Sequence, residues 1–330
     1  MADTKKTVLI TGSTRSIGLA LAQHYTKEGW NVIGTKRANS NTDQLEALSP
    51  FKTVVLDAGD EASILETARQ LEGVPIDLLI NNAGICMADG LASATKDAFM
   101  RQFEVNAVGP FLVTRALLPN LELAVKANGS ATVAHVSSLL GSISFNTSEN
   151  VGFFSQGCSY ATSKTALNMV TRCMFMELSD SNILFVTLNP GYVDTDMNQH
   201  QGYLKPSESV EGMANIIAKL SPEDSGKFFS ADAEYPGPAL QCSIGTPLVQ
   251  GSALTFTCTI WRTLFTSQVP GSFAYVAAME WVMYRLRRTY NIVAAAFIAR
   301  ILAEQLDETV EDEEDRAFLD QQLGMTRGPQ

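Results

Sequence analysis

The chain has 330 residues, which is enough for one large domain or two modest ones. Its hydrophobic fraction of 45% is ordinary for a globular protein, and its net charge of -11 argues against nucleic-acid binding, which needs a basic surface. Much of that charge is local, because residues 304–320 hold nine acidic residues against the single cation Arg316.

Short apolar runs alternate with longer helical patterns over the first two-thirds of the chain, as in βαβ units of a parallel sheet. The apolar runs predict strands at residues 7–10, 31–34, 53–56, 76–80, 131–137, 183–188 and 227–230. The helical patterns predict helices at residues 16–28, at 99–126, and from Tyr160 to about residue 178. Gly109 and Pro110 predict a kink inside the second helix. The expected fold is α/β, a doubly wound parallel sheet of the Rossmann type.

The pattern changes after Pro236. Residues 237–266 are rich in Gly, Pro, Ser and Thr and predict a loop, whereas residues 272–306 are helical and amphipathic and lead into the acidic end. We therefore expect a Rossmann-type domain at residues 1–236 and a mostly helical C-terminal extension at residues 237–330. Two interpretations of the extension stay open: a docking element that could form a homo-oligomer, or an appendage from an atypical gene architecture.

A glycine-containing segment, Thr11-Gly-Ser-Thr-Arg-Ser-Ile-Gly18, follows the first strand and opens the first helix. In that context Gly12 permits a tight turn, Gly18 allows close packing of the helix, and the helix N-terminus can face a pyrophosphate. Three cations are predicted to converge beside it: Arg15, Lys36 and Arg37. Cations suit the 2′-phosphate of NADP, whereas an acid would suit the ribose of NAD. The sequence therefore predicts NADP as the cofactor.

Tyr160 and Lys164 lie four residues apart on a predicted helix, downstream of a strand that ends near Ser138. Such a pair alone is common in helices and can serve packing or solubility. A tyrosine has an ordinary pKa of about 10. A lysine one turn away favours the phenolate, and a facing serine can hold a substrate oxygen. We interpret the three residues as an oxidoreductase site and expect Lys164 to lower the pKa of Tyr160.

These motifs stand in an order that resembles the short-chain dehydrogenase/reductases over about residues 6–236. The motifs that carry the resemblance are Thr11 to Gly18, Asp57, Asn81-Asn82-Ala83-Gly84, Asn106, Ser138, Tyr160 with Lys164, and Asn189-Pro190-Gly191. The 21 residues between Ser138 and Tyr160 make the chain similar to the carbonyl-reductase-like and C-signal-like branch. That long loop either shapes the substrate site or is a tolerated surface insertion.

The resemblance implies a role for each matching residue. The implied catalytic residues are Asn106, Ser138, Tyr160 and Lys164, with Asn106 supporting a water-linked proton relay behind the lysine. The implied cofactor-binding residues are Gly12, Ser13, Arg15, Ser16, Ile17, Gly18, Lys36, Arg37, Asp57, Asn82, Ala83, Gly84, Tyr160, Lys164, Pro190, Gly191, Val193 and Thr195. The chain departs from the family pattern at Ser16, which stands where the family has its middle glycine. Its Cβ should crowd the approach to the cofactor and lower the affinity.

Other side chains indicate no further chemistry. The five cysteines are odd in number and form no C-x-x-C pair, which suits free thiols in a reducing compartment. The three histidines have no metal-ligand spacing, so we expect no metal site, and His135 should be a packed strand residue. With no apolar signal segment and no apolar run of membrane-spanning length, we expect a cytoplasmic protein without a membrane span.

The leading expectation is an NADPH-dependent oxidoreductase that transfers a hydride to a small carbonyl compound, with Tyr160 as the general acid and base. The alternative is an NADP-sensing regulatory or interaction protein that keeps the fold and uses the C-terminal extension as a partner surface. The four implied catalytic residues favour the enzyme, because a pure sensor needs neither Tyr160 nor Ser138. Ser16 and the unusual extension favour the alternative.

Overall fold

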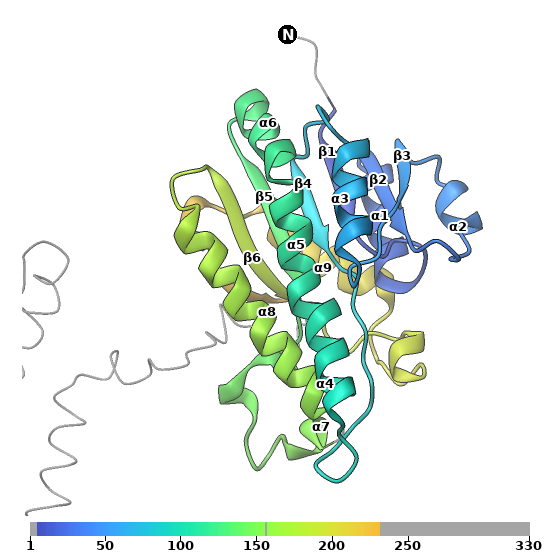
Figure 1. Cartoon of the computed structure of the whole chain (residues 1–330), viewed down its shortest axis with the longest axis vertical. Helices are drawn as coiled ribbons and strands as arrows, with labels where there is room; N and C mark the ends of the chain where they lie inside the picture. The colour runs from blue at the N-terminus through green and yellow to red at the C-terminus, as the bar shows by residue number, and fades with distance from the viewer. Residues whose placement is uncertain (1–4, 156, 232–330) are drawn as a thin grey trace, which may run out of the picture. The chain divides into compact units, whose positions relative to one another are not determined.

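The computed structural model describes residues 5–155 and 157–231. Within them, parallel strands form one sheet in the order β3-β2-β1-β4-β5-β6-β7 (Figure 1). The strands are β1 (Thr7–Ile10), β2 (Asn31–Lys36), β3 (Lys52–Val55), β4 (Leu78–Asn81), β5 (Ala131–Val136), β6 (Ile183–Asn189) and β7 (Phe228–Ser230). All are parallel to their neighbours, and the order reverses between β1 and β4. The predicted doubly wound Rossmann-type fold is confirmed.

Helices cover both faces of this sheet (Figure 1). The helices are α1 (Ser16–Lys27), α2 (Asp43–Glu46), α3 (Glu61–Gln70), α4 (Lys96–Phe103), α5 (Gly109–Ala116), α6 (Leu118–Asn128), α7 (Val151–Phe154), α8 (Cys158–Glu177) and α9 (Pro206–Ala218). Alternate strand residues point to opposite faces. Leu9 and Val133 therefore pack with α3, α5, α6 and α8, whereas Val8 and Ala134 pack with α1 and α9.

The predicted helix at residues 99–126 is broken at a different place from the one expected. The chain stays helical through Gly109 and Pro110, where a π-helical turn at Glu104–Val108 leads directly into α5. The wider π turn accommodates a proline that cannot make the usual i to i−4 hydrogen bond. The 55° bend lies instead between Ala116 and Leu118, because Pro119 begins a new helix there. The predicted kink at residues 109–110 was therefore wrong.

The sequence patterns also missed α9, which packs against α1. Its signals were present: Pro206 occupies the first turn, and the Glu208 carboxylate accepts a hydrogen bond from the backbone N–H of Lys205. The expected boundary at residue 236 and the whole C-terminal extension lie outside the described residues. Across the described part of the chain no single helix is long and apolar enough to cross a membrane, although α4 to α6 pass that test as a bent pair.

Candidate active site

A cleft of about 1270 Å³ runs along the carboxyl ends of the strands. That end of an open parallel sheet is where ligands bind in doubly wound folds. The volume exceeds that of a typical ligand pocket of roughly 300–1,000 Å³, which suits a large cofactor beside a substrate. The cleft is lined by the predicted residues Gly12, Arg15, Ser16, Ile17, Gly18, Lys36, Arg37, Asp57, Asn82, Ala83, Gly84, Ser138, Tyr160, Lys164, Pro190, Gly191, Val193 and Thr195.

Two predicted site residues do not line the cleft. Ser13 is fully buried, and its hydroxyl donates to the Thr35 carbonyl at 3.1 Å while accepting from the Thr35 amide at 2.7 Å. Its side chain therefore ties the glycine loop to β2, which corrects the expected contact with a cofactor. Asn106 is also fully buried and lies behind the cleft wall.

The glycine loop is built for a close approach of backbone to ligand. Gly12 has a φ of 66°, a left-handed conformation that glycine adopts without strain. A Cβ at Gly18 would lie 2.0 Å from the Gly12 carbonyl oxygen and 2.7 Å from Asn82 Nδ2, so no other residue fits there. Ser16 also has a left-handed φ, 49°, which is costly for a residue with a Cβ. The sequence thus has a serine, in a backbone conformation that favours glycine, at the position where it departs from the pattern of the family that it resembles.

The first turn of α1 is open to an anion. It contains no acidic residue, and no side chain caps its amides. Free amides and the positive end of a helix dipole together form an anion site of the kind that binds pyrophosphate. The glycine loop and this helix end therefore fit a dinucleotide cofactor.

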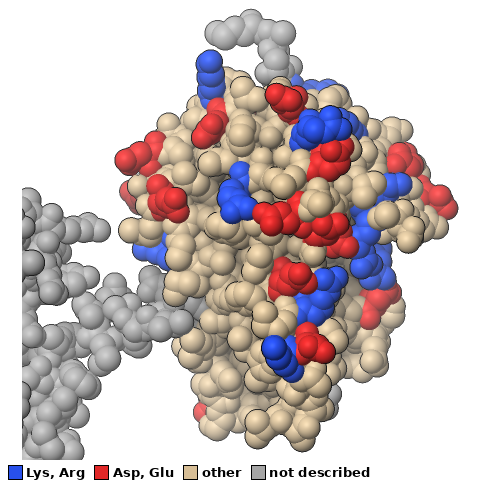
Figure 2. Space-filling model, viewed as in Figure 1, with Lys and Arg blue, Asp and Glu red and all other residues tan. Residues whose placement is uncertain are grey.

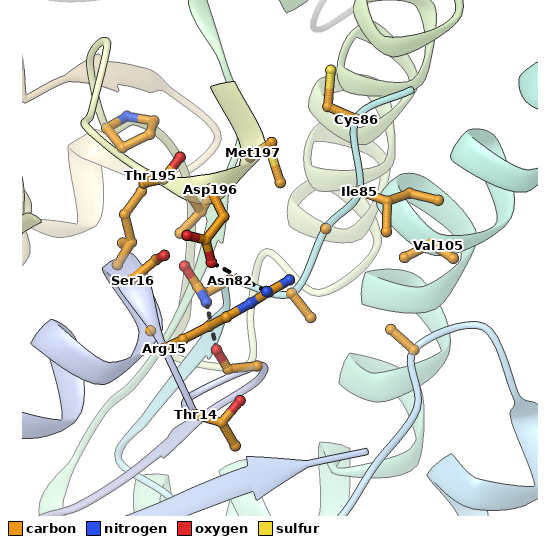
Figure 3. Close-up of a pocket in the computed structure, with 18 of the residues that line it drawn as sticks. Thr14, Arg15, Ser16, Asn82, Ile85, Cys86, Val105, Thr195, Asp196 and Met197 are labelled. Carbon is orange, nitrogen blue, oxygen red and sulfur yellow. Dashed lines mark hydrogen bonds and ion pairs between the residues drawn. The ribbon is translucent and has the colours of Figure 1, made fainter. Parts of the chain in front are cut away.

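The three cations expected beside the cofactor all line the cleft, but they differ in their partners. Lys36 and Arg37 lie at the end of β2, and neither forms an ion pair within the described residues. Arg15 instead crosses the cleft mouth to Asp196, with Nη1 3.2 Å from Oδ2 (Figure 3). Both side chains are exposed, so this pair contributes little stability. Arg15 is thus the one of the three predicted cations that has an acidic partner among the described residues, and its predicted contact with the cofactor stays a prediction.

The partner of Arg15 belongs to a charge cluster that sequence reasoning missed. His200 places Nδ1 2.6 Å from Asp194 Oδ1 and Nε2 3.1 Å from Asp196 Oδ1. The hydrogen bond that His200 donates to Asp194 is the main cause that raises the pKa of His200. Arg15 and Asp196 are separated by 181 residues, so nothing local in the sequence signals their contact.

The motif at Asn81 to Gly84 joins β1 to β4. Asn82 Nδ2 donates to the Thr11 carbonyl at 2.9 Å, while the amides of Asn82 and Ala83 both donate to the Thr11 hydroxyl at 2.9 Å. At the other end of the cleft wall, Asp57 accepts a hydrogen bond from the Gly59 amide at 2.9 Å. These bonds fix the two turns that would flank the cofactor.

The catalytic end of the cleft brings Ser138, Tyr160 and Lys164 together. Ser138 hydrogen-bonds to Tyr160, and its hydroxyl also accepts from the Leu140 amide at 3.2 Å. Lys164 is 4% exposed; its Nζ donates to the Val136 carbonyl at 2.8 Å and lies 5.7 Å from the centre of the Tyr160 ring. A serine, a phenol and an ammonium thus share one small polar site.

The pKa of Tyr160 differs from the one expected from the sequence. Burial raises the pKa of Tyr160 above its ordinary value; the charge of Cys86 adds to the rise, and the Ser138 hydrogen bond opposes it. Burial also lowers the pKa of Lys164 to about 8. The predicted lowering of the Tyr160 pKa by Lys164 is therefore wrong for this structure, because desolvation dominates and the ammonium is directed at a backbone carbonyl.

Asn106 supports the catalytic end from behind. It lies in the π-helical turn, a feature often found at functional sites. Its Oδ1 accepts from the Ile85 amide at 2.8 Å, and its Nδ2 donates to the Ile85 carbonyl at 2.8 Å and to Ser163 Oγ at 3.0 Å. A Cβ at Gly84 would lie 3.1 Å from Asn106 Oδ1 and 3.5 Å from Lys164 Nζ. Glycine keeps the space between them open.

A buried polar cluster next to Tyr160 was not predicted. Asp89 accepts hydrogen bonds from the amide and the hydroxyl of Ser159, and Gln102 donates to the same hydroxyl. Gln102 also accepts from the Met87 amide at 3.0 Å. Because Ser159 immediately precedes Tyr160, the cluster anchors the start of α8. His135 is fully buried between Thr114 and Thr171, the packed role expected for it.

Comparisons with known proteins agree with this geometry. The family model described as short chain dehydrogenase matches residues 6–203. The C-signal protein of Myxococcus xanthus is 40% identical over 159 residues, which cover 47% of this chain and 88% of that protein. The NADPH-bound carbonyl reductase from chicken fatty liver has a TM-score of 0.64 and 33% identity, covering 69% of this chain and 92% of its own. The carbonyl reductase Sniffer of D. melanogaster has a TM-score of 0.63 and 28% identity, covering 69% and 97%.

Proposed function

The chain belongs to the short-chain dehydrogenase family of oxidoreductases, and on that premise we propose that it is an NADPH-dependent reductase of a carbonyl compound. One observation carries the proposal: Ser138, Tyr160 and Lys164 meet at one end of a cleft whose other end presents Lys36 and Arg37. Chemistry and cofactor selection thus lie in a single cavity.

NADPH would be held by the parts of the cleft that fit it. The open first turn of α1 would take the pyrophosphate, and Lys36 and Arg37 would take the 2′-phosphate. When bound, the cofactor supplies a hydride to the carbonyl carbon, so the carbonyl becomes an alcohol. The NADPH in the chicken-liver carbonyl reductase structure supports this choice of cofactor by similarity.

The chain's own residues would supply the proton and the orientation. Tyr160 has its pKa raised by burial, so its phenol keeps a proton at neutral pH and can donate it to the carbonyl oxygen. Ser138, held by the Leu140 amide, would donate to the same oxygen as charge develops on it. Lys164, whose pKa is lowered by burial, lies 5.7 Å from the centre of the Tyr160 ring and donates to the Val136 carbonyl, and Asn106 fixes the segment beside it.

Replacing Tyr160 with Phe tests the assignment. The ring and its packing remain while the proton donor is lost, so turnover should fall by about 10²–10⁴-fold with the NADPH dissociation constant nearly unchanged. Aldehydes, ketones and quinones would be the substrates, with NADPH oxidation as the readout. Tyr25→Phe is the matched control, because Tyr25 is buried in α1 away from the cleft. A Tyr160→Phe enzyme that keeps more than a tenth of its turnover would contradict the role, provided that chemistry limits the rate.

The same assay separates the enzyme from an NADP-sensing protein. A sensor would bind NADPH and oxidise none of it with any carbonyl tested. Ser16, in its left-handed conformation, is the described feature that favours weak cofactor binding.

A further inference from the structure

Three segments border the catalytic end of the cleft, and none of them contains a lysine or an arginine. They are residues 85–95, 139–159 and 190–204, and each contributes residues to the cleft wall beside Tyr160. Their acidic residues are Asp89, Glu149, Asp194 and Asp196, and His200 is their single histidine. The segments that would surround a substrate are therefore poor in positive charge.

The first two of these segments meet in space, and all three line the same cleft. A bridge pairs Asp89 with Gly157 and so joins the first segment to the second, while a bridge between Val193 and Leu204 closes the third on itself. Figure 2 shows that charged side chains crowd the face in view over most of its length but are nearly absent at the end where α7 lies. The low charge therefore extends over the face in view at this end of the described domain.

Cationic groups that interact with these segments already have partners. Lys164 is buried and donates to the Val136 carbonyl. Arg15 pairs with Asp196, and His200 lies between Asp194 and Asp196. Among the described residues, a carboxylate or phosphate on a substrate would thus find no unpaired cation in this group, because Arg15 and His200 already pair with Asp196.

The three segments expose apolar side chains at the catalytic end of the cleft. Exposed apolar residues of the three segments are Met87, Leu91, Ile143, Val151, Tyr192, Met197 and Tyr203. Tyr192 and Met197, 41% and 49% exposed, line the cleft together with Leu140 and Cys86. The Tyr192 ring packs edge-on against Tyr203 with centroids 6.1 Å apart, which holds it in place. A site of this kind binds apolar surface.

We propose that the substrate is an uncharged, largely apolar carbonyl compound and that carbonyls carrying a carboxylate or phosphate are rejected. The inference rests on the proposed reductase function and adds the chemical class of its substrate. An anionic group entering this end would lose part of its hydration with no cation to replace it. Apolar groups would gain from burial against Tyr192, Met197 and Leu140.

Three aldehydes of similar shape test the proposal: benzaldehyde, methyl 4-formylbenzoate and 4-formylbenzoate. The last two differ mainly in charge. With NADPH saturating, kcat/KM for the methyl ester should exceed that for the anion at least about tenfold, and the gap should narrow at high salt because the rim is exposed. Equal values, or a faster anion, would overturn the proposal.

A charge placed at the cleft wall provides a second test. Met197→Lys keeps an unbranched side chain of similar length and should raise kcat/KM for 4-formylbenzoate about tenfold relative to its methyl ester. Met176→Lys is the matched control, because Met176 is exposed on α8 and does not line the cleft; it should leave the ratio unchanged. If Met197→Lys also leaves the ratio of kcat/KM for 4-formylbenzoate to that for its methyl ester unchanged, Met197 does not lie in an apolar wall that contacts the substrate.

Binding separates this inference from the function on which it rests. If none of the aldehydes is reduced although NADPH binds, the reductase function fails. Calorimetric titration of the NADP-loaded protein with methyl 4-(hydroxymethyl)benzoate and with 4-(hydroxymethyl)benzoate then decides the class of ligand. Tighter binding of the ester supports the uncharged class, and equal or tighter binding of the anion contradicts it.

Discussion

Ser16 places a strained residue at the point where the cofactor should approach most closely. A left-handed φ costs a residue with a Cβ about 1–2 kcal/mol, but a glycine there loses about 0.5–1 kcal/mol through its greater freedom in the unfolded chain. Ser16→Gly should therefore change stability little. Its clear effect should be on the cofactor, since loss of the Cβ lets the backbone approach the pyrophosphate.

We expect Ser16→Gly to lower the NADPH dissociation constant about tenfold, equivalent to about 1.4 kcal/mol. Ser49→Gly is the control: Ser49 has nearly the same φ, 52°, but lies in an exposed loop outside the cleft. Fluorescence titration and urea unfolding of both variants should show similar stability changes and tighter NADPH binding in Ser16→Gly alone. Equal affinities in the two variants would mean that the serine does not hinder the cofactor.

We expect buried Lys164 to lower the free energy of unfolding, although activity requires this residue. Burial lowers its pKa to about 8 from 10.5 in the unfolded chain, a penalty of about 3 kcal/mol at pH 7. The hydrogen bond to Val136 is already part of that environment, and its loss would cost about 1 kcal/mol. Lys164→Met should therefore abolish turnover yet raise the free energy of unfolding at pH 7 by about 2 kcal/mol.

The extra stability of Lys164→Met over the unmodified protein should decrease as the pH rises. Below about pH 8 the lysine is protonated in both states, and the penalty is complete. Between about pH 8 and 10.5 the unfolded chain still binds the proton while the folded protein does not, so the stability of the unmodified protein rises with pH. Urea unfolding at several pH values should show the advantage of Lys164→Met shrinking across this range. A constant difference, or a less stable variant at pH 7, would contradict the assignment.

At the scale of the elements, the end of β2 should determine cofactor choice. Lys36 and Arg37 project from this strand end without an ion pair among the described residues, while Arg15 is held by Asp196. A hydrogen bond to a charged group contributes about 1.5–3 kcal/mol. One good contact to the 2′-phosphate thus implies at least about a tenfold preference for NADPH over NADH.

Arg37→Asp should weaken NADPH strongly and NADH much less, because NADH lacks the 2′-phosphate. Lys96→Asp makes the same change in net charge at the first turn of α4, outside the cleft, where an acid is favourable. The measurement is kcat/KM for both cofactors in each variant and in the unmodified enzyme. A preference of the unmodified enzyme for NADH, or equal values, would show that these cations face solvent.

The elements that the sequence predicted well are those whose signals are local. Each strand contains at least two adjacent apolar residues, and the order of motifs located Ser138, Tyr160 and Lys164. Contacts between distant segments carry no such signal: Arg15 with Asp196, and Asp89 with Ser159, became visible only in the fold. Pro110 is a real helix-breaking signal, but the π turn before it accommodates the proline, so propensity alone misplaced the bend.

At the scale of the whole molecule, the described residues already contain a complete sheet. The strand β7 pairs with β6 along Phe228 to Ser230. From β6 the hydrogen-bonded strands continue without interruption to β3 at the opposite edge. Every residue assigned to the cleft lies before residue 199, and both apolar layers of the sheet are formed by described residues. The described residues up to 231 therefore supply seven paired strands and a lined cleft of their own.

We accordingly expect a chain truncated after Pro236 to fold and to bind NADPH with an affinity within about threefold of the full chain, since no contact assigned to the cofactor is removed. The truncation also deletes residues 304–320, which carry nine acids against Arg316, so the product should be far less acidic. Gel filtration of both chains would show whether the extension forms an oligomer, and NADPH titration would measure the cleft. Complete loss of cofactor binding in a folded truncated chain, judged by its circular dichroism, would show that residues 237–330 belong to the catalytic domain.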